Sequence, residues 1–171
     1  RLAHADTILI DKTGTLTEGR PVIIASRSGS HQEFKPIDPD CNDCAEAIAF
    51  AHAVERRSQH PLAQAIAQKA EELGVAERYQ SAEQVTVLPG LGVSGMVEGR
   101  KVHIGSHRLM DEGINHSEED CHQLRQAEDT GNTQIHVAVD GNLVASLLAI
   151  DAPRIGSKEA LTSLKEYRIK A

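Results

Sequence analysis

The sequence predicts an α+β fold in which an antiparallel sheet is flanked by helices. In the second half of the chain, two pairs of apolar segments are each separated by an acidic residue and a glycine, a pattern that favours tight hairpin turns. The strands are expected at 93–97 with 101–104 and at 134–139 with 143–150. Two helical stretches, over about 40–57 and 61–73, precede them. A chain of 171 residues is long enough to bury one good core around such a sheet.

The first element is a short apolar run, Ile8–Ile10, which predicts a buried strand that ends at Asp11. In open α/β sheets, ligands bind outside the carboxyl ends of the strands, where Asp11 would lie beside Lys12 and Thr13. A carboxylate held in such a place can attack a phosphoryl group and carry it as an aspartyl-phosphate. The sequence therefore predicts a phosphoryl-accepting site at Asp11.

The next segment is expected to enter a second structural region. Val22–Ala25 is apolar and predicts a strand, whereas residues 26–40 are rich in Ser, Gly, Pro and Asp and predict a loop. Asp40 is the expected N-cap of the first helix, with Cys41 and Cys44 in its first turn. A Cys-x-x-Cys pair can bind zinc, but a structural zinc site needs about four ligands and no second pair follows. The two cysteines are therefore expected to be thiols on the helix surface.

The stretch from Glu55 to Ala63 joins the two helices. Pro61 suits the first position of a helix, because the N–H that proline lacks would be unpaired there, and Gly74 is expected to end this helix. A histidine before a proline is most often a turn residue. His60, however, is placed at a helix N-terminus, where backbone N–H groups favour anions.

A glycine-rich segment, Pro-Gly-Leu-Gly-Val-Ser-Gly, occupies residues 89–95. Its Gly-x-Gly pattern, Gly90 and Gly92, is on its own most often a bend or bulge in a strand. It does not open a helix, so it is no dinucleotide-binding fingerprint. Further along, helices are expected over 117–131 and 158–167, the second one after a turn that contains Arg154.

The composition argues against several classes of function. The net charge is −7 with no basic run, and aromatic residues make up only 2% of the chain, so a nucleic-acid-binding surface is not expected. No stretch approaches 18 consecutive apolar residues, and no secretory signal pattern opens the sequence. Three cysteines do not suggest a disulfide framework. These features predict a soluble, acidic chain of cytosolic type.

Residues 11–17, Asp-Lys-Thr-Gly-Thr-Leu-Thr, resemble the phosphorylation motif of the P-type ion-transporting ATPases, within the haloacid dehalogenase-like superfamily. The resemblance implies that Asp11 accepts the γ-phosphoryl group of ATP, with Lys12 and Thr13 as its catalytic neighbours. It also implies that Asp11 and the Thr13 carbonyl ligate Mg²⁺. ATP and Mg²⁺ are thus the expected cofactors.

Residues 55–63 resemble the Ser-Glu-His-Pro-Leu signature of the heavy-metal-transporting members, with Gln59 in place of the usual Glu. The resemblance implies that His60 orients the adenine ring of ATP and that Glu55 contacts the base. Two glycines would line the same pocket, where their missing side chains admit the ligand, and an arginine would reach the phosphates. The residues expected to bind ATP are thus Glu55, His60, Gly90, Gly92 and Arg154.

The resemblance also implies the domain organisation. Residues 1–24 would begin a Rossmann-like α/β phosphorylation (P) domain, 25–150 would form an inserted nucleotide-binding (N) domain, and 151–171 would return to the P domain. The family's later Thr-Gly-Asp and Gly-Asp-Gly-x-Asn-Asp motifs do not occur, so the chain is expected to bind nucleotide but to turn over little ATP. Its partners would be the rest of the P domain and the actuator and transmembrane domains of a membrane-bound parent, in which this part is cytoplasmic.

The parent would be an ATP-driven heavy-metal cation exporter, and residues 54–66 are closer to zinc, cadmium or cobalt exporters than to copper exporters. One alternative is a haloacid dehalogenase-type phosphatase. Such enzymes normally carry a general acid two residues after the nucleophile, where Thr13 stands here. Another alternative is a metal-binding regulatory module that uses the nine histidines and the cysteine pair, although these histidines lack metal-ligand spacing.

Overall fold

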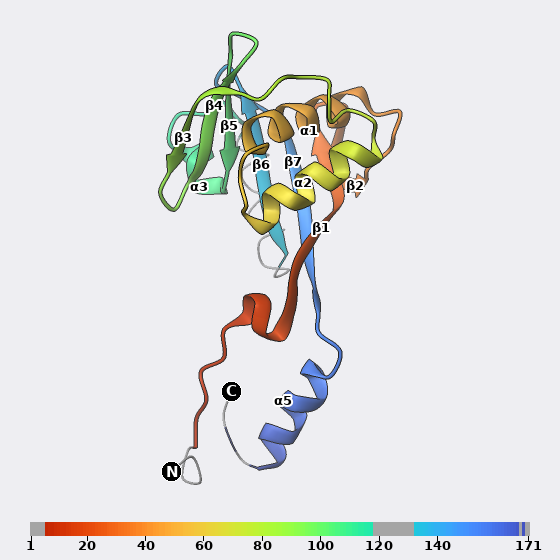
Figure 1. The fold of residues 1–171 in the computed structure, drawn as a ribbon, viewed down its shortest axis with the longest axis vertical. Helices are drawn as coiled ribbons and strands as arrows, with labels where there is room; N and C mark the ends of the chain where they lie inside the picture. Colours follow the sequence, from red (N-terminus) through yellow and green to blue (C-terminus); the bar gives the residue numbers. More distant parts are fainter. Residues whose placement is uncertain (1–5, 118–131, 168, 170–171) are drawn as a thin grey trace. The chain divides into compact units, whose positions relative to one another are not determined.

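The computed structural model describes residues 6–117, 132–167 and 169 (Figure 1). The chain divides into two compact units, which we call the terminal unit (Arg1–Pro21 with Asp151–Ala171) and the central unit (Val22–Ile150). None of the described helices is both long and apolar enough to cross a membrane. The helix expected over 117–131 lies almost wholly outside the described residues.

A seven-stranded sheet runs in the order β2-β1-β7-β6-β5-β4-β3. The pair β1–β2 and the successive pairs from β3 to β7 are antiparallel, so the predicted antiparallel sheet with flanking helices is confirmed. The strands are β1 (Thr17–Ser28), β2 (His31–Pro36), β3 (Glu83–Leu88), β4 (Gly92–Val97), β5 (Arg100–Gly105), β6 (Thr133–Val139) and β7 (Asn142–Pro153).

Helix α1 (Asn42–Glu55) is the centre of the core. It packs on α2 (Pro61–Glu72) and on β4, β5 and β6 (Figure 1). Between Cys44 and Val54 every residue except Glu46 is buried. A helix that is apolar on all sides belongs inside a protein, and five alanines in α1 let its neighbours approach closely.

The short helix α3 (His107–Asp111) covers the other face of the sheet. Leu109 and Met110 pack with Ala138 of β6, whereas the neighbouring residues Val137 and Val139 belong to the core under α1. Successive residues of a strand point to opposite faces, so the two clusters lie on opposite sides of β6. The central unit therefore has helices on both faces of its sheet.

Two predictions for the first 40 residues were wrong, one of a strand and one of a loop. Residues 8–10 form no strand, and Leu9 is fully exposed, because none of the described strands pairs with this segment and an unpaired strand cannot satisfy its backbone groups. The expected loop over 26–40 contains β2, which pairs with β1 in a hairpin that brings Ser28 opposite His31. This edge strand is half polar and lacks a clear alternating pattern, so its sequence resembles a loop.

The first turn of α1 also differs from expectation. Its N-cap is Cys41 rather than Asp40, because the Cys41 sulfur accepts a hydrogen bond from the Cys44 backbone N–H at 3.4 Å. Cys44 is completely buried, so the expectation that both cysteines are surface thiols was wrong. The second helix agrees with expectation: α2 begins at Pro61, and Gly74, with a φ of +68°, follows its C-cap.

Candidate functional site

A cleft of about 1070 Å³ opens in the central unit, between the end of α1, the start of α2 and strands β3 to β6. Three of the residues predicted to bind ATP, Glu55, His60 and Gly92, line this cleft together. Gly90 is not among its lining residues, although its neighbour Leu91 is. Arg154 and Asp11 belong to the terminal unit.

His60 is held in place by the start of α2. It is the N-cap residue, and its Nδ1 accepts a hydrogen bond from the Leu62 N–H at 3.2 Å. Its own N–H donates to the Ser58 hydroxyl, also at 3.2 Å. Because Nδ1 is an acceptor, a neutral His60 ring carries its proton on Nε2. The exposed imidazole therefore offers one N–H donor to a ligand in the cleft.

Apolar and polar side chains line the cleft together. Val85 and Val87 of β3 are unusually exposed for valines, at 47% and 73%, and both face the cleft. Half-buried Glu55 supplies a carboxylate at the rim. A flat, mostly apolar ligand with polar edges fits this distribution, because apolar walls hold a ring while a few polar groups fix its orientation.

Arg57 is a lining residue that sequence reasoning did not single out. Among the described residues that line the cleft, it is the only one with a permanent positive charge. It lies between Glu55 and His60 in the sequence, and this position is the feature that could have identified it. A guanidinium at the rim suits an anionic part of a ligand.

The glycines of the cleft serve the sheet. A Cβ on Gly92, where φ is +152°, would lie 2.0 Å from the Ile104 carbonyl oxygen, and a Cβ on its partner Gly105 would lie 2.1 Å from the Leu91 carbonyl oxygen. Both positions therefore need glycine for a backbone reason, and Gly105 was not predicted. The contact of Gly92 with ATP stays a prediction. Gly90 meets no atom within 4 Å and serves a turn through its φ of +74°.

In the terminal unit, exposed Asp11 precedes a single π-helical turn, Lys12–Leu16. Arg154 fastens this turn, because its Nη2 donates to the Gly14 carbonyl and its Nε donates to the Thr17 carbonyl, each at 2.9 Å. The predicted contact of Arg154 with phosphates stays a prediction. The side chains of Lys12 and Thr13 lie outside the described part of the structure.

Asp151 also holds the loop that follows Asp11. Its carboxylate accepts the Thr17 hydroxyl at 2.6 Å and the Arg20 backbone N–H at 3.1 Å. The Thr17 hydroxyl oxygen in turn accepts the Gly14 N–H at 3.1 Å. The loop after Asp11 is therefore held by a hydrogen-bond chain that ends on this one aspartate.

We expect Asp151→Ala to loosen the loop without unfolding the central unit. Loss of a hydrogen bond to a charged group costs roughly 1.5–3 kcal/mol, so amide exchange at Arg20 should speed up by about tenfold or more. Hydrogen exchange followed by NMR measures this. Asp140→Ala is the matched control, since Asp140 accepts the Lys101 N–H at 2.9 Å in the central unit. Unchanged exchange at Arg20 in Asp151→Ala would contradict the prediction.

Comparison with known proteins covers almost the whole chain. The sequence profile of the haloacid dehalogenase-like hydrolases matches residues 5–171. The silver exporting P-type ATPase of Salmonella typhimurium is 35% identical over 174 residues, which cover 99% of this chain and 19% of that protein. A probable cadmium-transporting ATPase of Alkalihalophilus pseudofirmus is 32% identical, over 95% of this chain and 22% of its own length. The chain thus spans about a fifth of these relatives.

Solved structures give the same picture. A zinc-transporting PIB-type ATPase in its E2.Pi state is similar with a TM-score of 0.63 and 26% identity, over 99% of this chain and 25% of that one. A catalytic CPx-ATPase domain has a TM-score of 0.62 and 27% identity, over 99% of this chain and 51% of that domain. The fold and the sequence therefore point to the same set of relatives.

Proposed function

Because this chain belongs to the haloacid dehalogenase-like hydrolases, and its relatives are heavy-metal P-type ATPases, we propose that it is the ATP-binding and phosphoryl-accepting part of a heavy-metal cation exporter. The observation that carries the proposal is the convergence of Glu55, His60 and Gly92 on one cleft. In this proposal the chain is a cytoplasmic piece of a membrane protein, whose remaining P-domain, actuator and transmembrane parts are its partners.

The cleft would select adenine by its polar rim. The Glu55 carboxylate can accept a hydrogen bond from the exocyclic amine of adenine, and His60 Nε2–H can donate to a ring nitrogen. Guanine presents a carbonyl oxygen where adenine has the amine, and a carboxylate repels it. Arg57 would attract the phosphates. ATP should therefore bind better than GTP.

Phosphoryl transfer would take place at Asp11 of the parent protein. A carboxylate oxygen of Asp11 forms a bond to the γ-phosphorus, the bond from that phosphorus to the bridging oxygen of ADP breaks, and ADP leaves with its electron pair. The Asp11 carboxylate and the Thr13 carbonyl are hard oxygen donors that suit Mg²⁺, which neutralises phosphate charge when bound. The Arg154 and Asp151 contacts with residues 14–20 would keep this loop in shape.

The ion is part of the proposal as well. Residues 54–66 favour a zinc, cadmium or cobalt exporter over a copper exporter, whereas relatives of this chain carry the names of silver, cadmium, copper and zinc transporters. The cleft residues do not distinguish between these ions, so ion-stimulated ATPase activity of the whole parent protein is the measurement that decides.

An NMR titration of this chain with ATP and then with GTP, with and without Mg²⁺, tests the nucleotide proposal. We expect shifts at Glu55, His60 and residues 91–93, stronger with ATP. His60→Ala should weaken ATP binding by about tenfold, the effect of losing one well-placed hydrogen bond and a ring contact. His116→Ala, a histidine outside the cleft, should bind ATP normally.

Glu55→Gln sharpens the test. The amide keeps an acceptor for adenine but adds a donor that suits the guanine carbonyl oxygen, so the preference for ATP over GTP should shrink. Equal responses to ATP and GTP in the unmodified chain, or shifts confined to residues near Asp11, would overturn the nucleotide proposal. Assays of phosphatase activity on small phosphate esters would then follow.

A further inference from the structure

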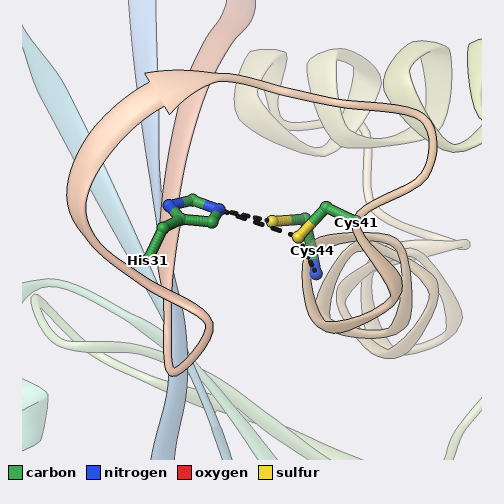
Figure 2. A group of neighbouring side chains, drawn as sticks. All are labelled: His31, Cys41 and Cys44. Atoms are coloured by element: carbon green, nitrogen blue, oxygen red, sulfur yellow. Dashed lines mark hydrogen bonds between the residues drawn. The ribbon is translucent and has the colours of Figure 1, made fainter.

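Three metal-ligating side chains converge at one end of the central unit, away from the residues that line the cleft. His31 comes from β2, and Cys41 and Cys44 come from the first turn of α1 (Figure 2). His31 Nε2 lies 3.1 Å from the Cys44 sulfur and 3.7 Å from the Cys41 sulfur. All three donor atoms lie within 4.8 Å of one another.

The histidine is oriented for a ligand. Its Nδ1 lies 3.1 Å from the Glu33 carbonyl oxygen, which can only accept, so Nδ1 carries the ring proton. Nε2 is then unprotonated, and its lone pair faces the two sulfurs (Figure 2). A backbone carbonyl that fixes the tautomer in this way is the usual outer contact of a metal-binding histidine.

The fold brings the three residues together from two segments. The hairpin between β1 and β2 places His31 opposite Ser28, over the N-terminus of α1. The Cys-x-x-Cys spacing puts both sulfurs on one side of the first helical turn, where the Cys41 sulfur caps the Cys44 N–H. Cys44 is buried, whereas His31 and Cys41 are partly exposed, so an ion can enter from solvent.

Serine hydroxyls surround the sulfurs. Ser26 donates to the Cys44 sulfur at 3.2 Å, and Ser30 lies 3.7 Å from the Cys41 sulfur. Burial raises the pKa of Cys41, but hydrogen bonds from Cys44 and Ser30 outweigh it and lower that pKa. Burial, with the hydrogen bond to Cys41, raises the pKa of Cys44. Hydrogen bonds to the sulfurs favour the charged form that a metal ion needs, whereas burial opposes it.

We propose that His31, Cys41 and Cys44 bind one thiophilic divalent cation of the zinc and cadmium class, with water in the fourth position. Thiolate and imidazole donors select such ions over Mg²⁺ or Ca²⁺. In a tetrahedral zinc site, bonds of about 2.0 Å to nitrogen and 2.3 Å to sulfur place these two donors about 3.5 Å apart. The observed 3.1 and 3.7 Å need shifts of only a few tenths of an ångström.

The site is independent of ATP binding and adds a metal function to this region. With three protein ligands and an open position, the ion should exchange more readily than one in a closed four-ligand structural site. Cysteine binds a metal ion as the thiolate, so metal uptake should release protons. It should also stabilise the hairpin against α1, since it links the two segments.

The test uses the whole chain, reduced and stripped of metal with a chelator. Titration with Cd²⁺ should produce a thiolate-to-metal charge-transfer band that saturates at one ion per chain, and Zn²⁺ should compete for the same site. His31→Ala and Cys41→Ser change partly exposed residues, so they should fold, and each should weaken binding by about 100-fold or more, at least the loss seen for outer contacts. The band should shrink in Cys41→Ser and persist in His31→Ala only at higher Cd²⁺.

A second cluster, His107, Asp111 and His116, supplies the matched control. His116→Ala should leave the affinity and the charge-transfer band unchanged, because that cluster has no sulfur. Binding that is insensitive to His31→Ala and Cys41→Ser, or lost in His116→Ala, would overturn the proposal. So would a reduced chain that binds no Cd²⁺ and in which Cys41 and Cys44 only form a disulfide on oxidation.

Discussion

Gly92→Ala should destabilise the central unit by about 3 kcal/mol or more, because overpacking and a disfavoured backbone conformation each cost about 1–3 kcal/mol. The new Cβ would lie 2.0 Å from the Ile104 carbonyl oxygen and 2.5 Å from the Gly105 Cα. Both are backbone atoms of the paired strand β5, so the clash cannot be relieved by rotation of a side chain. Strands β4 and β5 would have to separate at the wall of the cleft.

Gly90→Ala is the matched control, two residues away in the same segment. Its φ of +74° also disfavours alanine, but no atom lies within 4 Å of the added Cβ. The cost should therefore be only the conformational one, about 1–2 kcal/mol. Urea denaturation of the two variants measures the difference, and ATP titration should show weaker binding in Gly92→Ala. Equal stabilities would mean that the close approach of the two strands is not what requires glycine.

Acid should destabilise the central unit through His136. Burial, with smaller contributions from His107, His116 and Arg27, lowers the pKa of His136 from 6.5 to about 3. In the unfolded chain the imidazole takes up a proton below pH 6.5, whereas in the folded chain it stays neutral down to about pH 3. Stability that is present above pH 6.5 is therefore lost as the pH falls toward 3, by up to roughly 1.4 kcal/mol per pH unit.

His136→Asn should remove this part of the pH dependence, because asparagine can still bond to the Ser146 hydroxyl, which lies 2.8 Å from His136 Nδ1, but does not titrate. Urea denaturation between pH 7 and pH 4 measures the slope of stability against pH. Ser146→Ala is the control: it should lower stability at every pH and keep the slope. An unchanged slope in His136→Asn would assign acid sensitivity to other groups, such as His52 and His103, whose pKa values burial also lowers.

The sequence was sufficient to predict the elements whose ends are marked by proline or glycine. Pro61 and Gly74 mark both ends of α2, and an acidic residue followed by glycine marks the two central hairpins. β2 escaped prediction because an edge strand with polar residues on both faces has no alternating pattern. The strand expected at 8–10 failed for the opposite reason: its apolar pattern is clear, but a strand needs a neighbour with which to pair.

In the candidate sites, too, residues that are close in the sequence could be predicted, whereas residues that strand pairing brings together could not. Glu55 and His60 stand close together in the sequence, so their joint presence in the cleft could be predicted. Gly105 could not, since its glycine requirement comes from Leu91, which directly precedes the neighbouring strand β4. The cluster of His31 with the two cysteines depends on the register of the β1–β2 hairpin, which sequence spacing does not reveal.

One wall of the cleft is also the border of the sheet, because β3 is the last strand in the described order. Its outer edge has no strand partner among the described residues, and it carries exposed Val85 and Val87. An open, apolar strand edge invites pairing with another copy of the chain. A ligand that fills the cleft covers these valines. In storage or crystallisation, the chain should therefore self-associate less when the cleft is occupied than when it is empty.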